Sequence, residues 1–155
     1  LLVHERKLMA EIGSDSPRKV VAPTEAAKKY LEFHDGKISD AQLRSELVDY
    51  NMQMHAIALT HFRGFEEKSS GVRSAAPLVM KYLGTEAEKT KSELLLAIMG
   101  SQGLGWEGDA FTTEELDTLR LWAMSRTMTI AGGSSEVQLN VIAKNVLELP
   151  QSGGN

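Results

Sequence analysis

The residues best suited to bind a ligand lie in the stretch IAGGSSEVQ, residues 130–138. Glycines at positions 132 and 133 would let a flat or bulky ligand approach the backbone, because they carry no side chain. The hydroxyls of Ser134 and Ser135, with the free N–H groups of a helix start, could hold an anionic or polar group. Ser135 and Gln138 also fit a capping box, which starts a helix with no ligand at all. The spacing leaves both interpretations open.

Other residues with chemical potential form weaker patterns. Gly100, Gly103 and Gly105 spell G-x-x-G-x-G after a helical pattern, which is not the dinucleotide fingerprint and predicts a loop. The adjacent Glu5 and Arg6 could be an exposed ion pair, worth about 0–1 kcal/mol. A carboxylate becomes a useful base only when burial or neighbours tune its pKa. These patterns alone assign no reaction.

The histidines give no recognisable metal spacing. His55 and His61 are six residues apart, which puts them on different faces of a helix. A di-iron bundle needs paired Glu-x-x-His motifs that project inward, and the sequence contains none. There is also no cysteine to supply a thiolate ligand. We expect structural or surface histidines and no metal.

Helical periodicity and capping signals predict the elements that position these residues. Capping-box patterns at Ser39/Gln42 and Thr112/Glu115 predict two helix starts. No stretch alternates with a period of two, so we expect no sheet. The expected fold is all-α, an antiparallel four-helix bundle with short extra helices. We expect helices over about residues 1–12, 24–36, 39–68, 112–129 and 135–149, and another from near residue 75 to a glycine-rich loop at 100–112.

Composition limits the class of protein. The chain has 155 residues, enough for one domain, which we place at residues 1–150 with a flexible tail at 151–155. A net charge of −4 and the absence of a basic stripe argue against a nucleic-acid partner. No apolar run approaches the ~20 residues that span a bilayer. The lack of cysteine fits the cytoplasm of a bacterium or another reducing compartment.

The segment TIAGGSSEVQLNVIAKNVLELP, residues 129–150, closely resembles the C-terminal signature of the acyl-CoA dehydrogenases. Three further segments agree with this family in order and spacing, so that the resemblance spans nearly the whole chain. They are LLVHERKLMA at residues 1–10, APLVMKYLGTE at 76–86 and LLLAIMGSQGLGW at 94–106. The resemblance implies the C-terminal helical domain of a longer flavoprotein, whose other two domains precede it.

The resemblance also implies a cofactor, partners and site residues. Such enzymes hold FAD against this bundle, oxidise an acyl-CoA to an enoyl-CoA, and pass electrons to an electron-transfer flavoprotein. They assemble as homo- or hetero-oligomers through the bundle. By position, Gly133, Ser134 and Glu136 match FAD contacts, Gly103 matches a contact to the flavin of a neighbouring subunit, and Arg6 matches an arginine that lines the acyl-CoA site.

Two departures from the family pattern bear on function. Many members carry the catalytic glutamate where this chain has Gly132, and others carry it on the first helix, where this chain has Glu5. We therefore expect Glu5 to be the base. The usual RxQFG flavin-binding segment is replaced by residues 28–44. The alternatives are a non-catalytic subunit or domain of a heteromeric enzyme, or an unrelated helical interaction module; the 155-residue chain by itself is expected to be inactive.

Overall fold

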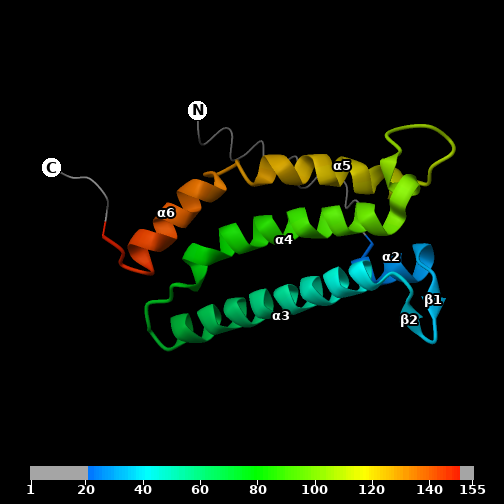
Figure 1. Ribbon diagram of the computed structural model, residues 1–155. Helices are drawn as coiled ribbons and strands as arrows, with labels where there is room; N and C mark the ends of the chain where they lie inside the picture. Colours follow the sequence, from blue (N-terminus) through cyan, green and yellow to red (C-terminus); the bar gives the residue numbers. More distant parts are fainter. Residues whose placement is uncertain (1–20, 151–155) are drawn as a thin grey trace.

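The computed structural model describes residues 21–150 of the chain, and these residues are almost entirely helical (Figure 1). The elements in chain order are α2 (Pro23–Tyr30), β1 (Phe33–His34), β2 (Lys37–Ile38), α3 (Ala41–Ser69), α4 (Ala76–Met99), the 3₁₀ helix η1 (Gly100–Leu104), α5 (Thr113–Met128) and α6 (Ser135–Asn145). The helix predicted over residues 1–12 and the tail predicted at 151–155 lie outside the described residues.

Helix α4 is the centre of the described fold. It packs against α3 and α5, which lie on either side of it, and it also contacts α2, η1 and α6 (Figure 1). Short connections reverse the chain between α3 and α4 and again between α4 and α5, so these neighbours run antiparallel. The predicted fold class, an all-α antiparallel bundle, is confirmed.

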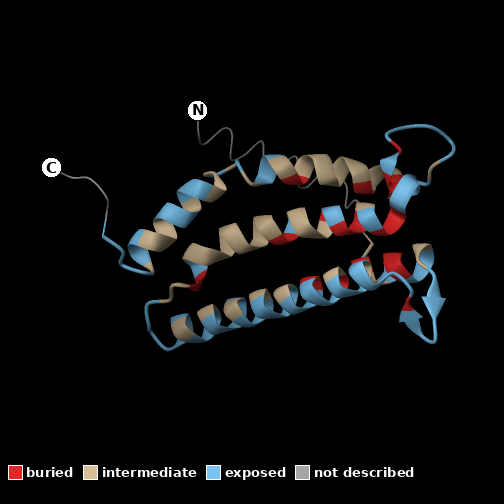
Figure 2. Ribbon diagram, in the orientation of Figure 1, coloured by how far each residue is buried: buried red, intermediate tan, exposed pale blue. Residues whose placement is uncertain are grey.

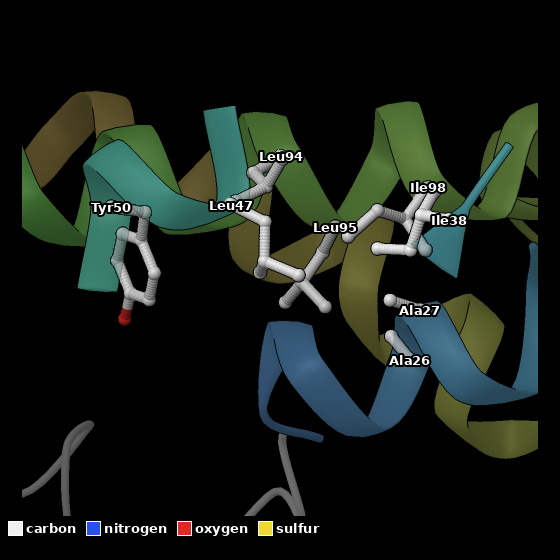
Figure 3. Close-up of a cluster of buried hydrophobic side chains, with 8 residues drawn as sticks. All are labelled: Ala26, Ala27, Ile38, Leu47, Tyr50, Leu94, Leu95 and Ile98. Carbon is white, nitrogen blue, oxygen red and sulfur yellow. The ribbon is translucent and has the colours of Figure 1, made fainter. Parts of the chain in front are cut away.

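The main core lies where α2, α3 and α4 meet. Leu94, Leu95 and Ile98 project from the second half of α4 toward the first half of α3 and toward α2 (Figure 3). Small side chains on α2 allow its backbone to approach α4 closely, which suits a helix of only 8 residues. The cluster consists of Ala26, Ala27, Ile38, Leu47, Tyr50, Leu94, Leu95 and Ile98.

A β-hairpin follows α2, so the expectations of no sheet and of a helix reaching Gly36 are wrong. Helix α2 ends at Tyr30. The two-residue strands β1 and β2 then pair antiparallel, with Phe33 opposite Ile38. Asp35 and Gly36 have φ of 50° and 73°, as a tight hairpin turn requires. Strands of two residues are too short to show alternation, and the Asp-Gly pair is the only local signal for the turn.

The helix boundaries largely agree with the predictions, but two caps are shifted. Thr112 and Glu115 form the predicted capping box at the start of α5. At the start of α3 the cap is Asp40, whose Oδ1 accepts from the N–H of Leu43 at 2.9 Å, so the predicted Ser39 cap is wrong. Helix α3 ends at Ser69, one residue beyond the prediction, while α6 ends at Asn145, short of the predicted residue 149.

Candidate functional site

The turn between α5 and α6 depends on two glycines. Gly132 and Gly133 have φ of 70° and 108°, in the region where a Cβ is costly. A Cβ on Gly133 would also lie 2.8 Å from Nε2 of Gln138, whereas one on Gly132 would meet nothing within 4 Å. The turn brings the chain back toward α4, and Gly132 stays exposed at the surface.

Ser134, not Ser135, is the N-cap of α6. The Oγ of Ser134 accepts from the N–H of Val137 at 3.4 Å, and Ser135 is the first helical residue. Gln138 donates from Nε2 to the carbonyl of Gly132 at 3.4 Å instead of returning to the helix start. The predicted capping box of Ser135 and Gln138 is therefore wrong by one residue, and the hydroxyl of Ser135 has another partner.

Helix α4 holds this turn in place through polar side chains. Lys81 donates from Nζ to the carbonyl of Gly133. Ser135 donates from Oγ to Oε1 of Glu86 at 2.9 Å, and Oε2 of Glu86 lies 2.5 Å from Nζ of Lys89. The hydrogen bond from Lys89, with a smaller contribution from Ser135, lowers the pKa of Glu86. The start of α6 is thus fixed to the first half of α4 by charge-assisted contacts.

Glu136 lies in the first turn of α6 and is exposed. A hydrogen bond with Ser134, and a smaller one with the helix backbone, keep the pKa of its carboxyl below the ordinary value. An ionised carboxylate at this position can accept hydrogen bonds from the hydroxyl or N–H groups of a ligand. Gly133, Ser134 and Glu136 therefore lie close together around the start of α6.

Gly103 lies in a different part of the fold. It is buried in η1, where a Cβ would come within 3.2 Å of Cδ2 of Leu96 and of Cβ of Met99. This contact explains a glycine there by packing alone. Glu86 contacts the α6 turn, and Met99 lies beside Gly103. At a rise of 1.5 Å per residue these two residues are about 20 Å apart along α4. Within one chain, Gly103 and the α6 turn therefore lie too far apart to form one site.

The residues predicted for the substrate side, Glu5 and Arg6, lie outside the described residues. The three described histidines are all exposed. Across residues 21–150, no group of three or more His, Asp or Glu side chains is placed to hold a metal ion. Within the same range, no helix combines the length and the apolar character that crossing a membrane requires.

Two features of the site were missed by sequence reasoning. Lys81 and Glu86 both lie in the segment APLVMKYLGTE, which stands out in the sequence only for its resemblance to a family segment, and their contact with the α6 turn has no local signal. The second is a cavity of about 170 Å³ between α4 and α5. Leu95, Leu121 and Met124 line it, and the hydroxyls of Ser92 and Ser125, 3.2 Å apart, lie in its wall.

One family of known proteins matches most of the chain. The family described as "Acyl-CoA dehydrogenase, C-terminal domain" matches residues 2–147. Acyl-CoA dehydrogenase IpdE1 of Mycolicibacterium smegmatis (strain ATCC 700084 / mc(2)155) is 37% identical over 73 residues, and IpdE1 of Mycobacterium tuberculosis (strain ATCC 25618 / H37Rv) is 34% identical over 73 residues. Each match covers 47% of this chain and only 18% of the relative.

A solved structure has a similar fold. The Tcur3481-Tcur3483 steroid ACAD superposes with a TM-score of 0.64 at 20% identity, over 84% of this chain and 33% of the solved chain. The identity is too low to carry more than the fold. The family match, however, covers residues 2–147 and therefore includes η1, the α6 turn and α6. It excludes the alternative of an unrelated helical interaction module. This chain belongs to the acyl-CoA dehydrogenase family, as its C-terminal domain.

Proposed function

We propose that the chain is the FAD- and acyl-CoA-contacting, oligomerising C-terminal domain of an enzyme that desaturates an acyl-CoA thioester between its α and β carbons. The observation that carries this proposal is the α6 turn. Its two glycines adopt positive φ angles that reverse the chain, and Lys81 and Glu86 hold the turn in one position on α4. A rigid, preorganised binding surface loses less conformational entropy when a ligand binds.

The chemistry of the turn suits a dinucleotide such as FAD. Peptide N–H groups at the start of α6 can donate to anionic oxygens, and the hydroxyl of Ser134 can donate or accept. The carboxylate of Glu136 can accept from ribityl or ribose hydroxyls. We assign Gly133, Ser134 and Glu136 to FAD, and Gly103 to the flavin of a neighbouring subunit. The latter assignment agrees with the distance along α4 between η1 and the α6 turn.

In the proposed reaction Glu5 removes a proton from the α carbon of the acyl-CoA, and Arg6 binds the substrate beside it. FAD, when bound, supplies the acceptor for the hydride that leaves the β carbon. The product is an enoyl-CoA, with the proton on Glu5, and the electrons leave to an electron-transfer flavoprotein. We place the protein in the cytoplasm of a bacterium or in another reducing compartment, because the sequence has no cysteine.

The test uses the complete polypeptide that contains this chain. Glu5→Gln should abolish acyl-CoA-dependent reduction of a dye while FAD absorbance per protein stays at the wild-type level, because the amide cannot accept the proton. Glu11→Gln, a matched change in the same segment, should leave turnover unchanged. Turnover within a fewfold of wild type in Glu5→Gln would contradict Glu5 as the base. Straight-chain, branched and steroid side-chain thioesters should be compared as substrates.

A second function is favoured by one observation, the hairpin. Residues 28–44, which replace the family's usual flavin-binding segment, form the end of α2, the hairpin and the start of α3. With Gly132 where many members carry the base, the chain could belong to a non-catalytic subunit whose partner supplies flavin contacts and base. This candidate requires that the isolated complete polypeptide lacks FAD and that both FAD and activity appear when a second acyl-CoA dehydrogenase chain is co-expressed.

A further inference from the structure

The carbonyl of Gly133 is held by a cation that makes no other hydrogen bond or ion pair in the described part of the chain. Lys81 donates from Nζ to this carbonyl, and no carboxylate within residues 21–150 forms an ion pair with it. Glu86, the next carboxylate along α4, pairs with Lys89 instead. Most of the first half of α4 is half-buried, drawn tan in Figure 2, and the turn lies beside it (Figure 1). At such a place a charge-assisted bond is screened less than on an open surface.

The contact with Lys81 orients the peptide that joins Gly133 to Ser134. The described residues contain no cis peptide, and in a trans peptide the C=O and the N–H point in opposite directions. Because the carbonyl of Gly133 faces Lys81 on α4, the N–H of Ser134 points away from Lys81. Within residues 21–150 this N–H makes no hydrogen bond. It is therefore available to a ligand at the start of α6.

The glycine at position 133 makes this orientation depend on a tertiary contact. Because glycine permits many ψ angles, local sterics do not fix the plane of the peptide that follows it. The preceding peptide has other constraints, since the N–H of Gly133 donates to the carbonyl of Ile130 at 3.2 Å and the carbonyl of Gly132 accepts from Gln138 at 3.4 Å. The peptide after Gly133 has Lys81 in this role. A hydrogen bond from a cation also polarises the peptide, which strengthens its N–H as a donor.

We propose that Lys81 is a positioning residue for FAD, which acts through the Gly133–Ser134 peptide and presents the N–H of Ser134 to an oxygen acceptor of the cofactor. The anionic phosphoryl oxygens are the strongest such acceptors. Lys81 need not touch the cofactor, because its ammonium group lies against the carbonyl at the other end of the peptide. The Oγ of Ser134 caps α6 through the N–H of Val137, so the hydroxyl and the backbone N–H of Ser134 have separate functions. This inference rests on the proposed binding of FAD at the turn.

The dissociation constant of FAD from the complete polypeptide, measured by titration of the apoprotein, tests the role of the cation. Lys81→Met keeps the length of the side chain but donates nothing, and should raise this constant by about 5- to 50-fold. Lys81→Arg keeps the charge and a donor and should stay within about threefold of the wild type. Lys68→Met, at an exposed lysine in the last turn of α3, is the control and should change nothing. Wild-type affinity in Lys81→Met overturns the inference, whereas a wild-type polypeptide that binds no FAD contradicts the proposed function.

A double-variant cycle separates this role from a merely structural one. Proline at position 134 removes the N–H, and its fixed φ of about −65° matches the φ of −62° found there. Ser134→Ala is the matched reference, because it removes the hydroxyl alone. Lys81→Met should raise the FAD dissociation constant in the Ser134→Ala background and leave it unchanged in the Ser134→Pro background. An equal increase in both backgrounds overturns the inference, since Lys81 would then support the turn as a whole. Circular dichroism checks that each variant keeps its helix content.

Carbonyl chemical shifts give a readout that needs neither FAD nor a stable Ser134→Pro variant. In the 155-residue chain labelled with carbonyl-¹³C glycine and ¹⁵N serine, the Gly–Ser peptides at positions 13–14, 100–101 and 133–134 are the ones that give a correlation. Ser134→Ala removes the last of these signals and so identifies it. Lys81→Met should move the carbonyl carbon of Gly133 to lower chemical shift, because a hydrogen bond to a carbonyl oxygen deshields its carbon, and should leave the other two in place. If this signal stays where it is, Lys81 does not hold the carbonyl in solution and the inference is overturned.

Discussion

Ser135 donates its hydroxyl to Oε1 of Glu86 at 2.9 Å, across 49 positions of sequence, and this bond fixes the first residue of α6 to the middle of α4. The bond lies directly beside the residues assigned to FAD, so it links the packing of the helices to the geometry of the turn. Its effect on cofactor binding can be separated from its effect on stability.

Glu86→Ala should lower the FAD content of the complete polypeptide several-fold while costing only about 0.5–2.5 kcal/mol of unfolding free energy, the usual net value of one hydrogen bond and one partly exposed ion pair. The FAD-to-protein ratio and the thermal midpoint give the two readouts. Glu86→Gln keeps an acceptor for Ser135 and should recover most of the FAD. Glu88→Ala is the control, since Glu88 is exposed on the same helix and makes no contact with the turn. Undiminished FAD in Glu86→Ala would remove Glu86 as a positioning residue.

Gly133→Ala should destabilise the chain by at least about 1–2 kcal/mol, because an L-residue is strained at positive φ. The new Cβ would in addition press on Gln138, 2.8 Å away, which must move. Gly84→Ala provides a control of opposite sign. Gly84 lies inside α4, and a Cβ added there would meet nothing within 4 Å, so alanine should stabilise by about 0.5–1 kcal/mol. Urea unfolding measures both, and a stabilised Gly133→Ala would contradict the backbone geometry of the turn.

Acidification should weaken the junction of α2 and α5 through Glu115. This side chain is buried, and the N–H of Thr112, followed by the hydroxyl of Tyr30, donates to its carboxylate and lowers its pKa. A lowered folded-state pKa means that the stabilisation is complete above about pH 4.3, the unfolded value, and is lost as the pH falls through the folded value.

Unfolding free energies measured between pH 3 and pH 7 should therefore fall less steeply in Glu115→Gln than in the wild type. Tyr30→Phe removes one donor and should give an intermediate slope. Glu107→Gln, at an exposed position in the loop before α5, should reproduce the wild-type slope. If the Glu115→Gln and wild-type curves stayed parallel over the whole range, the carboxylate would not be the titrating group.

Leu95→Ala should cost about 2–5 kcal/mol, since Leu95 is 1% exposed and its side chain lies both in the main core and in the wall of the α4–α5 cavity. Leu104→Ala, at a leucine that is 70% exposed in η1, should change the unfolding free energy by less than about 0.5 kcal/mol. Chemical unfolding of the two variants side by side gives the comparison, and equal costs would show that the assigned core is wrong.

The long helices could be predicted from the sequence because their signals are local. Thr112 and Glu115 are three residues apart, and their capping box forms as the pattern indicates. The hairpin after Tyr30 escaped prediction because strands of two residues have no measurable period. The start of α6 was misplaced by one residue because Ser134 and Ser135 are equally good caps by residue type. In the fold the hydroxyl of Ser135 is bonded to Glu86, a residue distant in sequence, and Ser134 is the cap.

Only those residues of the candidate site that lie close together in the sequence could be predicted. Gly133, Ser134 and Glu136 are neighbours in the chain, so their meeting at one surface needed no tertiary information. Lys81 and Glu86 reach the turn only because α6 folds back over α4, and no spacing rule connects positions that far apart.

The central position of α4 also has a consequence for how the domain unfolds. Each of the other four described helices, and η1, contacts α4. A disturbance that melts α4 therefore removes the support of every neighbour at once, and no described helix pair would survive it as a stable subunit. The described part should behave as one cooperative foldon, in which backbone amides of α4 exchange with solvent only through global opening. Binding at the α6 turn would then protect amides as far away as α2.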